Sequence, residues 1–192
     1  MLDSPKDLLH ITSIGWFILF AYWMYSGMRT KITVKRQKYS SRVVYLLLMI
    51  GAFGLVYAGS FKIGFLGVRF LPEINWISYL GLAINLAGII FAIVARTWLG
   101  SNWSGTVTVK KDHELIQSGP YAVTRHPIYT GLLFGLLGSA IILGEIRGLI
   151  AIVLFYISVQ IKITLEEKFM ETEFPEYNNY RRRTRKLIPF IY

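Results

Sequence analysis

The sequence predicts an all-α integral membrane protein with five transmembrane helices. Of its 192 residues, 54% are hydrophobic and only 17% are charged, and the mean hydropathy is +0.46. Soluble domains usually have about 25% charged residues, so this deficit indicates lipid as the main solvent. Apolar stretches of membrane-spanning length occur five times, and Lys and Arg gather in the segments between them.

Each of the five apolar stretches is expected to form a helix, because about 20 apolar residues suffice to cross the hydrocarbon layer. They are 8–28, 43–61, 74–95, 127–144 and a fifth that begins near residue 148. The fifth meets Lys162 and Glu166 without a helix breaker, so it is expected to continue beyond the membrane. The charged segment 62–71 is too short to span and is expected to be a loop or an interfacial piece.

The basic residues predict the orientation of these spans. Six lie in 29–42, four in 96–126 and five in the tail 181–186. An odd number of spans places these three segments on one side, which the positive-inside rule makes the cytosol. We therefore expect a multi-pass protein with its N-terminus outside and its C-terminus in the cytosol.

The sequence also argues against nucleic-acid binding, a metal site and a cleaved signal peptide. The net charge of +10 raises the possibility of nucleic-acid binding, but the basic residues follow the pattern of membrane loops, so no nucleic-acid partner is expected. There is no cysteine, and the histidines are too far apart in sequence to match a metal-ligand spacing, so no metal site is expected. The first ten residues lack a basic region and a cleavage site, which predicts no cleaved signal peptide.

The two halves of the chain differ in composition. Residues 1–95 are expected to form three ordinary membrane helices. Residues 96–192 hold the polar chemistry: a 31-residue loop, two spans and a charged tail. Within the loop, the alternation at 107–109 is consistent with a small strand.

The run Arg125-His126-Pro127-Ile128-Tyr129-Thr130-Gly131 marks the start of the fourth span. Proline favours the first helical turn and disfavours helical geometry in the preceding residue, so His126 is expected at the N-cap. The free N–H groups of this turn would then form an anion site facing the cytosol. The alternative is an interfacial His/Tyr anchor with a glycine seam, since Gly131 and Gly135 allow a helix to approach closely.

A second polar group lies where the fifth helix leaves the membrane. Lys162 precedes Glu166 by four residues, so both share one helical face, and Glu167 follows directly. Ionisable residues at this depth are costly and therefore suggest a function. The alternative is a snorkelling lysine with an ordinary ion pair.

Taken together, an ordered set of short motifs resembles the isoprenylcysteine carboxyl methyltransferase family and its phospholipid-methyltransferase relatives. The set covers roughly residues 95–190, about half of the chain. The motifs are Asn102-Trp103-Ser104, His113-x-Leu115, Gly119-Pro120-Tyr121, Arg125-His126-Pro127-x-Tyr129-x-Gly131, Glu166-Glu167, Phe174-Pro175-x-Tyr177-x-x-Tyr180 and Leu187-Ile188-Pro189.

The resemblance implies that S-adenosylmethionine binds in a cytosolic pocket built from the 96–127 loop and the C-terminal helix. Residues 1–95 would then be a scaffold with substrate entry, and 96–192 the catalytic half. Lys162 and Glu166 are expected to be catalytic, although members that methylate prenylcysteine have arginine at the position of Lys162 and glutamine at that of Thr108. The expected cofactor contacts are His113, Glu114, Leu115, Ile116, Tyr121, His126, Pro127, Ile128, Tyr129 and Glu166.

This reading predicts methylation of a carboxylate on a lipophilic small molecule or lipidated acceptor that enters from the membrane lipid. A carboxylate is already deprotonated at pH 7, whereas an amine would need Glu166 or Glu167 as a base. Three alternatives stay open: N-methylation of a phospholipid or other amine, NADPH-dependent reduction as in sterol reductases, and a non-enzymatic scaffold or transporter. No obligatory protein partner is evident.

Overall fold

The computed structural model describes the whole chain except residues 1–3, 37–38, 62, 105–107, 111–113 and 189–192. The helices of the described chain are α1 Pro5–Gly27, α2 Tyr39–Tyr57, α3 Asn75–Leu99, α4 Pro127–Leu143, α5 Ile146–Glu173 and α6 Tyr177–Arg183. Short 3-10 turns lie at Gly59–Phe61, Gly64–Gly67, Gly100–Asn102 and Gly119–Ala122. The two strands are β1 Thr33–Arg36 and β2 Thr108–Lys110.

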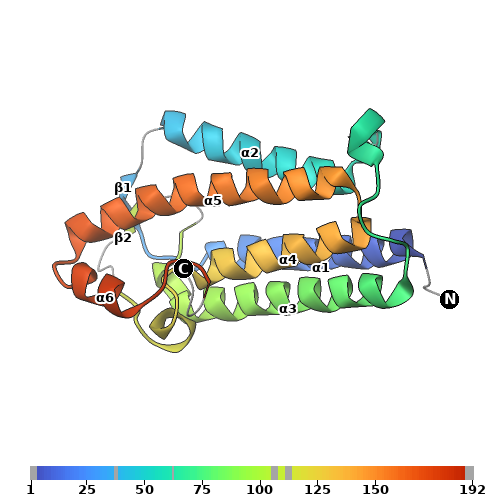
Figure 1. The fold of residues 1–192 in the computed structure, drawn as a ribbon. Coiled ribbons are helices and arrows are strands. Elements are labelled where there is room, and N and C mark those ends of the chain that lie inside the picture. The colour runs from blue at the N-terminus through green and yellow to red at the C-terminus, as the bar shows by residue number, and fades with distance from the viewer. Residues whose placement is uncertain (1–3, 37–38, 62, 105–107, 111–113, 189–192) are drawn as a thin grey trace.

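The long helices run side by side in two layers (Figure 1). Helices α2 and α5 pack together as one layer, and α1, α3 and α4 form the other, with α3 and α4 in the most extensive contact. The N-terminus lies at one end of the bundle, and α6, β1, β2 and the C-terminal segment lie at the opposite end. The basic segments identified in the sequence therefore gather at a single end.

All five predicted apolar stretches form helices. Helices α1, α3 and α5 are long and apolar enough to cross a membrane, whereas α4 and the apolar part of α2, Arg42–Tyr57, are shorter. The 17 residues of α4 extend about 26 Å at ~1.5 Å per residue, close to the ~30 Å of a hydrocarbon core. Most of α4 is buried by its neighbours, so it lies inside the bundle.

The glycine seam predicted for the fourth span packs against α3. A Cβ built at Gly131 would lie 2.5 Å from the Gly88 carbonyl oxygen, and one at Gly81 would lie 2.8 Å from that of Gly138. Any larger residue here would force the helices apart. The buried Asn85 Nδ2 donates to the Gly135 carbonyl at 2.8 Å and ties the same two helices.

The end of the bundle that holds the α4–α5 turn contains the buried Glu145 and Arg147 and the partly exposed Arg69. We call these three residues the hairpin cluster. The Arg147 Nε donates to the Glu145 carboxylate at 2.7 Å, and its Nη1 donates to the carbonyls of Leu55 and Ala58 at 2.9 and 3.1 Å. Arg69 Nη1 caps the end of α4 by donating to the Leu143 carbonyl at 3.0 Å. These arginines satisfy carbonyls that helix ends leave unpaired.

One small sheet departs from the all-α prediction. Strand β1 pairs antiparallel with β2, with Thr33 opposite Lys110 and Arg36 opposite Thr108. The alternation at 107–109 predicted the second strand within one residue, but not its partner. The partner lies about 75 residues earlier, and only the folded bundle brings the two segments together.

Candidate functional site

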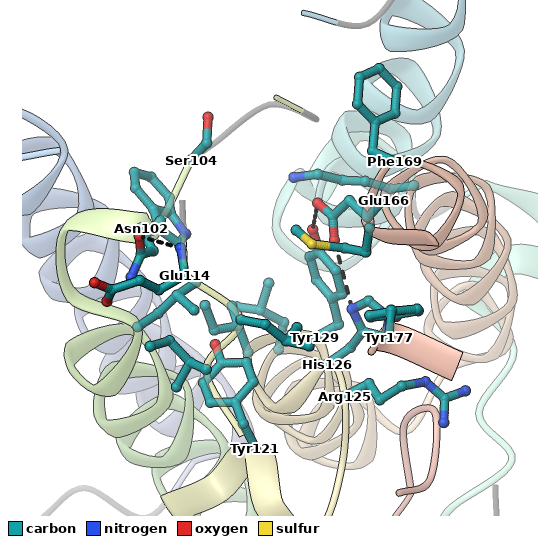
Figure 2. Close-up of a pocket in the computed structure, with 18 of the residues that line it drawn as sticks. Asn102, Ser104, Glu114, Tyr121, Arg125, His126, Tyr129, Glu166, Phe169 and Tyr177 are labelled. Carbon is teal, nitrogen blue, oxygen red and sulfur yellow. Dashed lines mark hydrogen bonds and ion pairs between the residues drawn. The ribbon is translucent and has the colours of Figure 1, made fainter. Parts of the chain in front are cut away.

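A cavity of about 290 Å³ opens at the end of the bundle that carries α6. Its walls come from α1, α2, α4, α5, α6 and the segment 99–126, so both halves of the chain contribute (Figure 2). Most of the predicted site residues line it. They are Glu114, Leu115, Ile116, Tyr121, His126, Ile128, Tyr129, Lys162 and Glu166. Pro127 is buried at the first turn of α4 without lining the cavity, and His113 lies outside the described residues.

The start of α4 takes the predicted form. Helix α4 begins at Pro127, and His126 is its N-cap residue with φ −128° and ψ 56°. The imidazole does not cap the helix; it lies between two carboxylates. Its Nε2 is 3.2 Å from Glu167 Oε1, and its Nδ1 is 3.6 Å from Glu166 Oε2, which is too long for a hydrogen bond.

Glu167 is held away from the cavity by an arginine. Arg125 Nε donates to Glu167 Oε1 at 2.7 Å, and both side chains are less than a tenth exposed. Arg125 Nη1 also donates to the carbonyls of Thr184 and Arg181 at 2.6 and 3.1 Å. The pair therefore joins α5 to the turn before α4 and to the C-terminal segment.

Glu166 points toward the cavity (Figure 2). The Tyr129 hydroxyl donates to its Oε1 at 2.6 Å. Lys162, one turn earlier on the same face as predicted, is buried with its Nζ 5.3 Å from the centre of the Tyr129 ring and 5.6 Å from that of Tyr45. We call Arg125, His126, Tyr129, Glu166 and Glu167 the site cluster.

The C-terminal segment covers one side of the cavity. Tyr180 donates its hydroxyl to the Tyr121 carbonyl at 2.7 Å, and the Thr130 hydroxyl donates to the Leu187 carbonyl at 2.5 Å. Burial raises the pKa of the Tyr121, Tyr177 and Tyr180 hydroxyls, so they stay protonated at neutral pH. All three tyrosines line the cavity as neutral aromatic groups.

The cavity also contains residues that sequence reasoning missed. Trp23 of α1 and Tyr45, Leu46 and Met49 of α2 form its apolar wall. Nothing in the sequence separates these residues from lipid-facing ones, since they lie within ordinary apolar runs. Trp103 was named only as part of a motif; it packs beside Trp23 at 6.0 Å and stacks under the buried Arg96 guanidinium at 4.4 Å.

The fold and the cavity define a helical membrane protein with a polar and aromatic site at one end of the bundle. A family model described as phospholipid methyltransferase matches residues 76–177, more than half of the chain. The chain therefore belongs to the phospholipid methyltransferase family. This confirms the resemblance inferred from the ordered motifs.

Known relatives agree with this assignment. The cobalt-zinc-cadmium resistance protein CzcN of Cupriavidus metallidurans is 33% identical over 116 residues, which cover 60% of this chain and 52% of that protein. Protein-S-isoprenylcysteine O-methyltransferase of Tribolium castaneum is 33% identical over 125 residues, covering 63% of this chain and 44% of that protein. The chain thus spans about half the length of the curated relatives it matches.

A solved structure supports the fold. The eukaryotic intramembrane Ras methyltransferase ICMT superposes with a TM-score of 0.59 at 24% identity, covering 81% of this chain and 55% of that one. At this identity the similarity concerns the fold alone. Within the described residues, no group of three or more His, Cys, Asp or Glu side chains is arranged to hold a metal ion.

Proposed function

We propose that this protein is an S-adenosylmethionine-dependent methyltransferase that methylates a carboxylate of a lipophilic acceptor. The observation that carries the proposal is the mixed lining of the cavity. It combines Glu166 of α5 and His126 at the start of α4 with the apolar side chains of Trp23, Leu46 and Met49. A charged, polar cofactor and a lipophilic acceptor need these two environments side by side.

The polar side chains of the cavity suit the cofactor. Glu166 offers a carboxylate to its ammonium group, and the free N–H groups at the start of α4 suit its carboxylate. Tyr121 and Tyr177 are aromatic walls suitable for an adenine ring. The cofactor supplies a sulfonium-bound methyl group, which leaves sulfur as the acceptor oxygen bonds to it, giving a neutral ester and a thioether without release of a proton.

The chain's own contribution is to hold the acceptor and exclude water. Lys162 is buried at the side of the cavity and can attract a carboxylate, which needs no base at pH 7. In-line displacement depends mainly on positioning in a dry site, which the apolar walls and the cover of α6 favour. Several relatives are named protein-S-isoprenylcysteine O-methyltransferase, which supports a lipidated carboxylate as acceptor.

We further propose that all five apolar helices span the membrane, with the N-terminus outside and the cavity in the cytosol. The basic segments lie at the end of the bundle that carries α6, and the N-terminus lies at the other end, as an odd number of spans requires (Figure 1). Residues of α6 also line the cavity, which places it at the basic end. In this arrangement residues 1–95 supply the apolar wall through α1 and α2, and residues 96–192 supply the polar chemistry. In this arrangement a lipophilic acceptor would reach the apolar wall from the bilayer.

N-methylation of a phospholipid or other amine is the second candidate, favoured by the description of the matching family model. An amine acceptor must lose a proton, and Glu166 and Glu167 were the predicted bases. Glu167 accepts from Arg125 and His126 and does not line the cavity, which leaves Glu166 as the candidate base. The arrangement therefore supports the carboxylate acceptor better.

Calorimetry on detergent-purified protein tests the cofactor. We expect S-adenosylmethionine and S-adenosylhomocysteine to bind at micromolar affinity and NADPH not to bind. Glu166→Ala should weaken adenosyl binding by about 100-fold, because it removes a partly buried charged contact. Glu171→Ala, an exposed carboxylate further along α5, is the matched control and should change affinity by less than about twofold.

Methyl transfer is then measured with two acceptors, a prenylated N-acetylcysteine and phosphatidylethanolamine. Transfer to the first alone supports the proposal, and transfer to the second alone establishes the amine alternative. Folded protein that binds NADPH and no adenosyl ligand would overturn the methyltransferase proposal in favour of a reductase.

A further inference from the structure

Tyr45 on α2 has an unusual environment for a buried tyrosine. Its side chain is 1% exposed and lines the cavity, yet its hydroxyl has no hydrogen-bond partner among the described residues. The buried hydroxyls of Tyr129 and Tyr180 both donate to protein acceptors. Since buried polar groups are nearly always paired, an unpaired hydroxyl beside a cavity points to a partner that is not part of the protein.

The position of Tyr45 is fixed by α5. Ser158 donates its hydroxyl to the Tyr45 carbonyl at 2.7 Å, and both residues are fully buried. Lys162 follows Ser158 by one turn, and its ammonium lies over the rings of Tyr45 and Tyr129 at 5.6 and 5.3 Å. The two rings therefore keep the ammonium beside the Tyr45 side chain through cation–π attraction.

The surrounding charges favour an anion at this corner of the cavity. Arg42, three residues before Tyr45, is exposed, and its charge acts on both Tyr45 and Lys162. The nearby carboxylate, Glu166, has Oε1 bonded to Tyr129 and Oε2 facing His126. A positively charged acceptor would meet the Lys162 ammonium here, whereas an anionic one would meet that ammonium and a hydroxyl donor.

We propose that the Tyr45 hydroxyl and the Lys162 ammonium together bind the carboxylate of an anionic amphiphile, whose apolar chain lies along Leu46 and Met49. The lysine is a point charge without a preferred direction, so the hydroxyl supplies the directional hydrogen bond. Holding one carboxylate oxygen in this way leaves the other free to receive the methyl group. The inference rests on the proposed function and makes Tyr45 a determinant of acceptor specificity.

The test compares Tyr45→Phe with the wild type, using the full chain in nanodiscs of zwitterionic lipid. Affinity for prenylated N-acetylcysteine is measured in the presence of S-adenosylhomocysteine, and again for the analogue in which a carboxamide replaces the carboxylate. We expect Tyr45→Phe to weaken carboxylate binding by about tenfold, the usual effect of losing a hydrogen bond to a charged group. Binding of the carboxamide should be weak in both proteins and should differ by less than about twofold.

Two controls distinguish a failure of this inference from a failure of the proposed function. The affinity for S-adenosylhomocysteine should be the same in both proteins, which also shows that the variant is folded. Tyr79→Phe, at a half-exposed tyrosine near the opposite end of α3, is the matched control and should change neither affinity. Failure of the wild type to bind S-adenosylhomocysteine would refute the proposed function itself.

If that ligand binds normally, three results overturn the inference alone. One is carboxylate affinity that Tyr45→Phe leaves unchanged. Another is equal affinity of the wild type for the carboxylate and the carboxamide. The third is a wild type that binds no prenylated carboxylate at all.

Discussion

The two ends of the bundle both contain a buried arginine–glutamate pair with the same 2.7 Å separation. At one end Arg147 pairs with Glu145 in the hairpin cluster, and at the other Arg125 pairs with Glu167 in the site cluster. All four side chains are less than a tenth exposed. Burial and ion pairing alone therefore do not distinguish a functional site from an ion pair that only stabilises the fold.

The two ion pairs differ in the groups that they contact. The Arg147 Nη1 donates to the backbone carbonyls of Leu55 and Ala58, and no residue of the hairpin cluster lines the cavity. Glu167 instead contacts His126, which lies beside Glu166 at the cavity wall. We infer that the hairpin cluster stabilises the fold, whereas the site cluster positions side chains for a ligand.

Arg147→Ala gives the largest expected effect. It removes the buried guanidinium that pairs with the Glu145 carboxylate and donates to the carbonyls of Leu55 and Ala58, so the unfolding free energy should fall by about 3–5 kcal/mol. The measurement is unfolding in detergent, followed by far-UV circular dichroism. At temperatures where the variant is still folded, its affinity for S-adenosylhomocysteine should match the wild type.

Arg147→Lys is the control, because it keeps the charge and should retain part of the lost stability. A variant with normal stability and weak ligand binding would contradict the structural role of this cluster. It would also remove the distinction between the two ends of the bundle.

This contrast also shows what the sequence can and cannot predict about the fold. Apolar length predicted all five long helices, and proline chemistry predicted that α4 begins at Pro127. Arg69 and Arg147 lie outside the three basic segments, and nothing in their sequence context predicts that both bond to carbonyls at helix ends. The fifth apolar stretch was expected to begin near residue 148, and α5 begins two residues earlier, at Ile146.

The candidate site also contains residues that the sequence could predict and residues that it could not. Polar residues at membrane depth are expensive, so the sequence pattern pointed to His126, Lys162 and Glu166, and all three line the cavity. Apolar residues carry no such signal, and Trp23 and Met49 became site residues only because α1 and α2 fold beside the polar cluster. The separate roles of Glu166 and Glu167 depend on which way each side chain points, which adjacency in sequence does not determine.

Glu167→Gln sharpens the comparison at the site end. The amide removes the charge that holds Arg125 and His126, so S-adenosylhomocysteine binding should weaken by about tenfold. Glu171→Gln is the matched control on α5; it breaks the exposed pair with Arg181 and should change affinity by less than about twofold. A catalytic base at Glu167 would instead give normal ligand binding and a loss in kcat alone.

The smallest expected effect comes from removing one hydroxyl at each end. Tyr180→Phe loses the bond to the Tyr121 carbonyl, which ties α6 to the cavity wall, and should weaken S-adenosylhomocysteine binding by about threefold to fivefold.

Tyr57→Phe loses bonds to Thr12 and Ser139 away from the cavity, so it should lower the unfolding free energy by about 1 kcal/mol and leave binding unchanged. Calorimetry and detergent unfolding on both variants separate these effects. Equal losses of binding in the two proteins would mean that the cavity responds to the stability of the whole bundle, and the division between a stabilising end and a binding end would then fail.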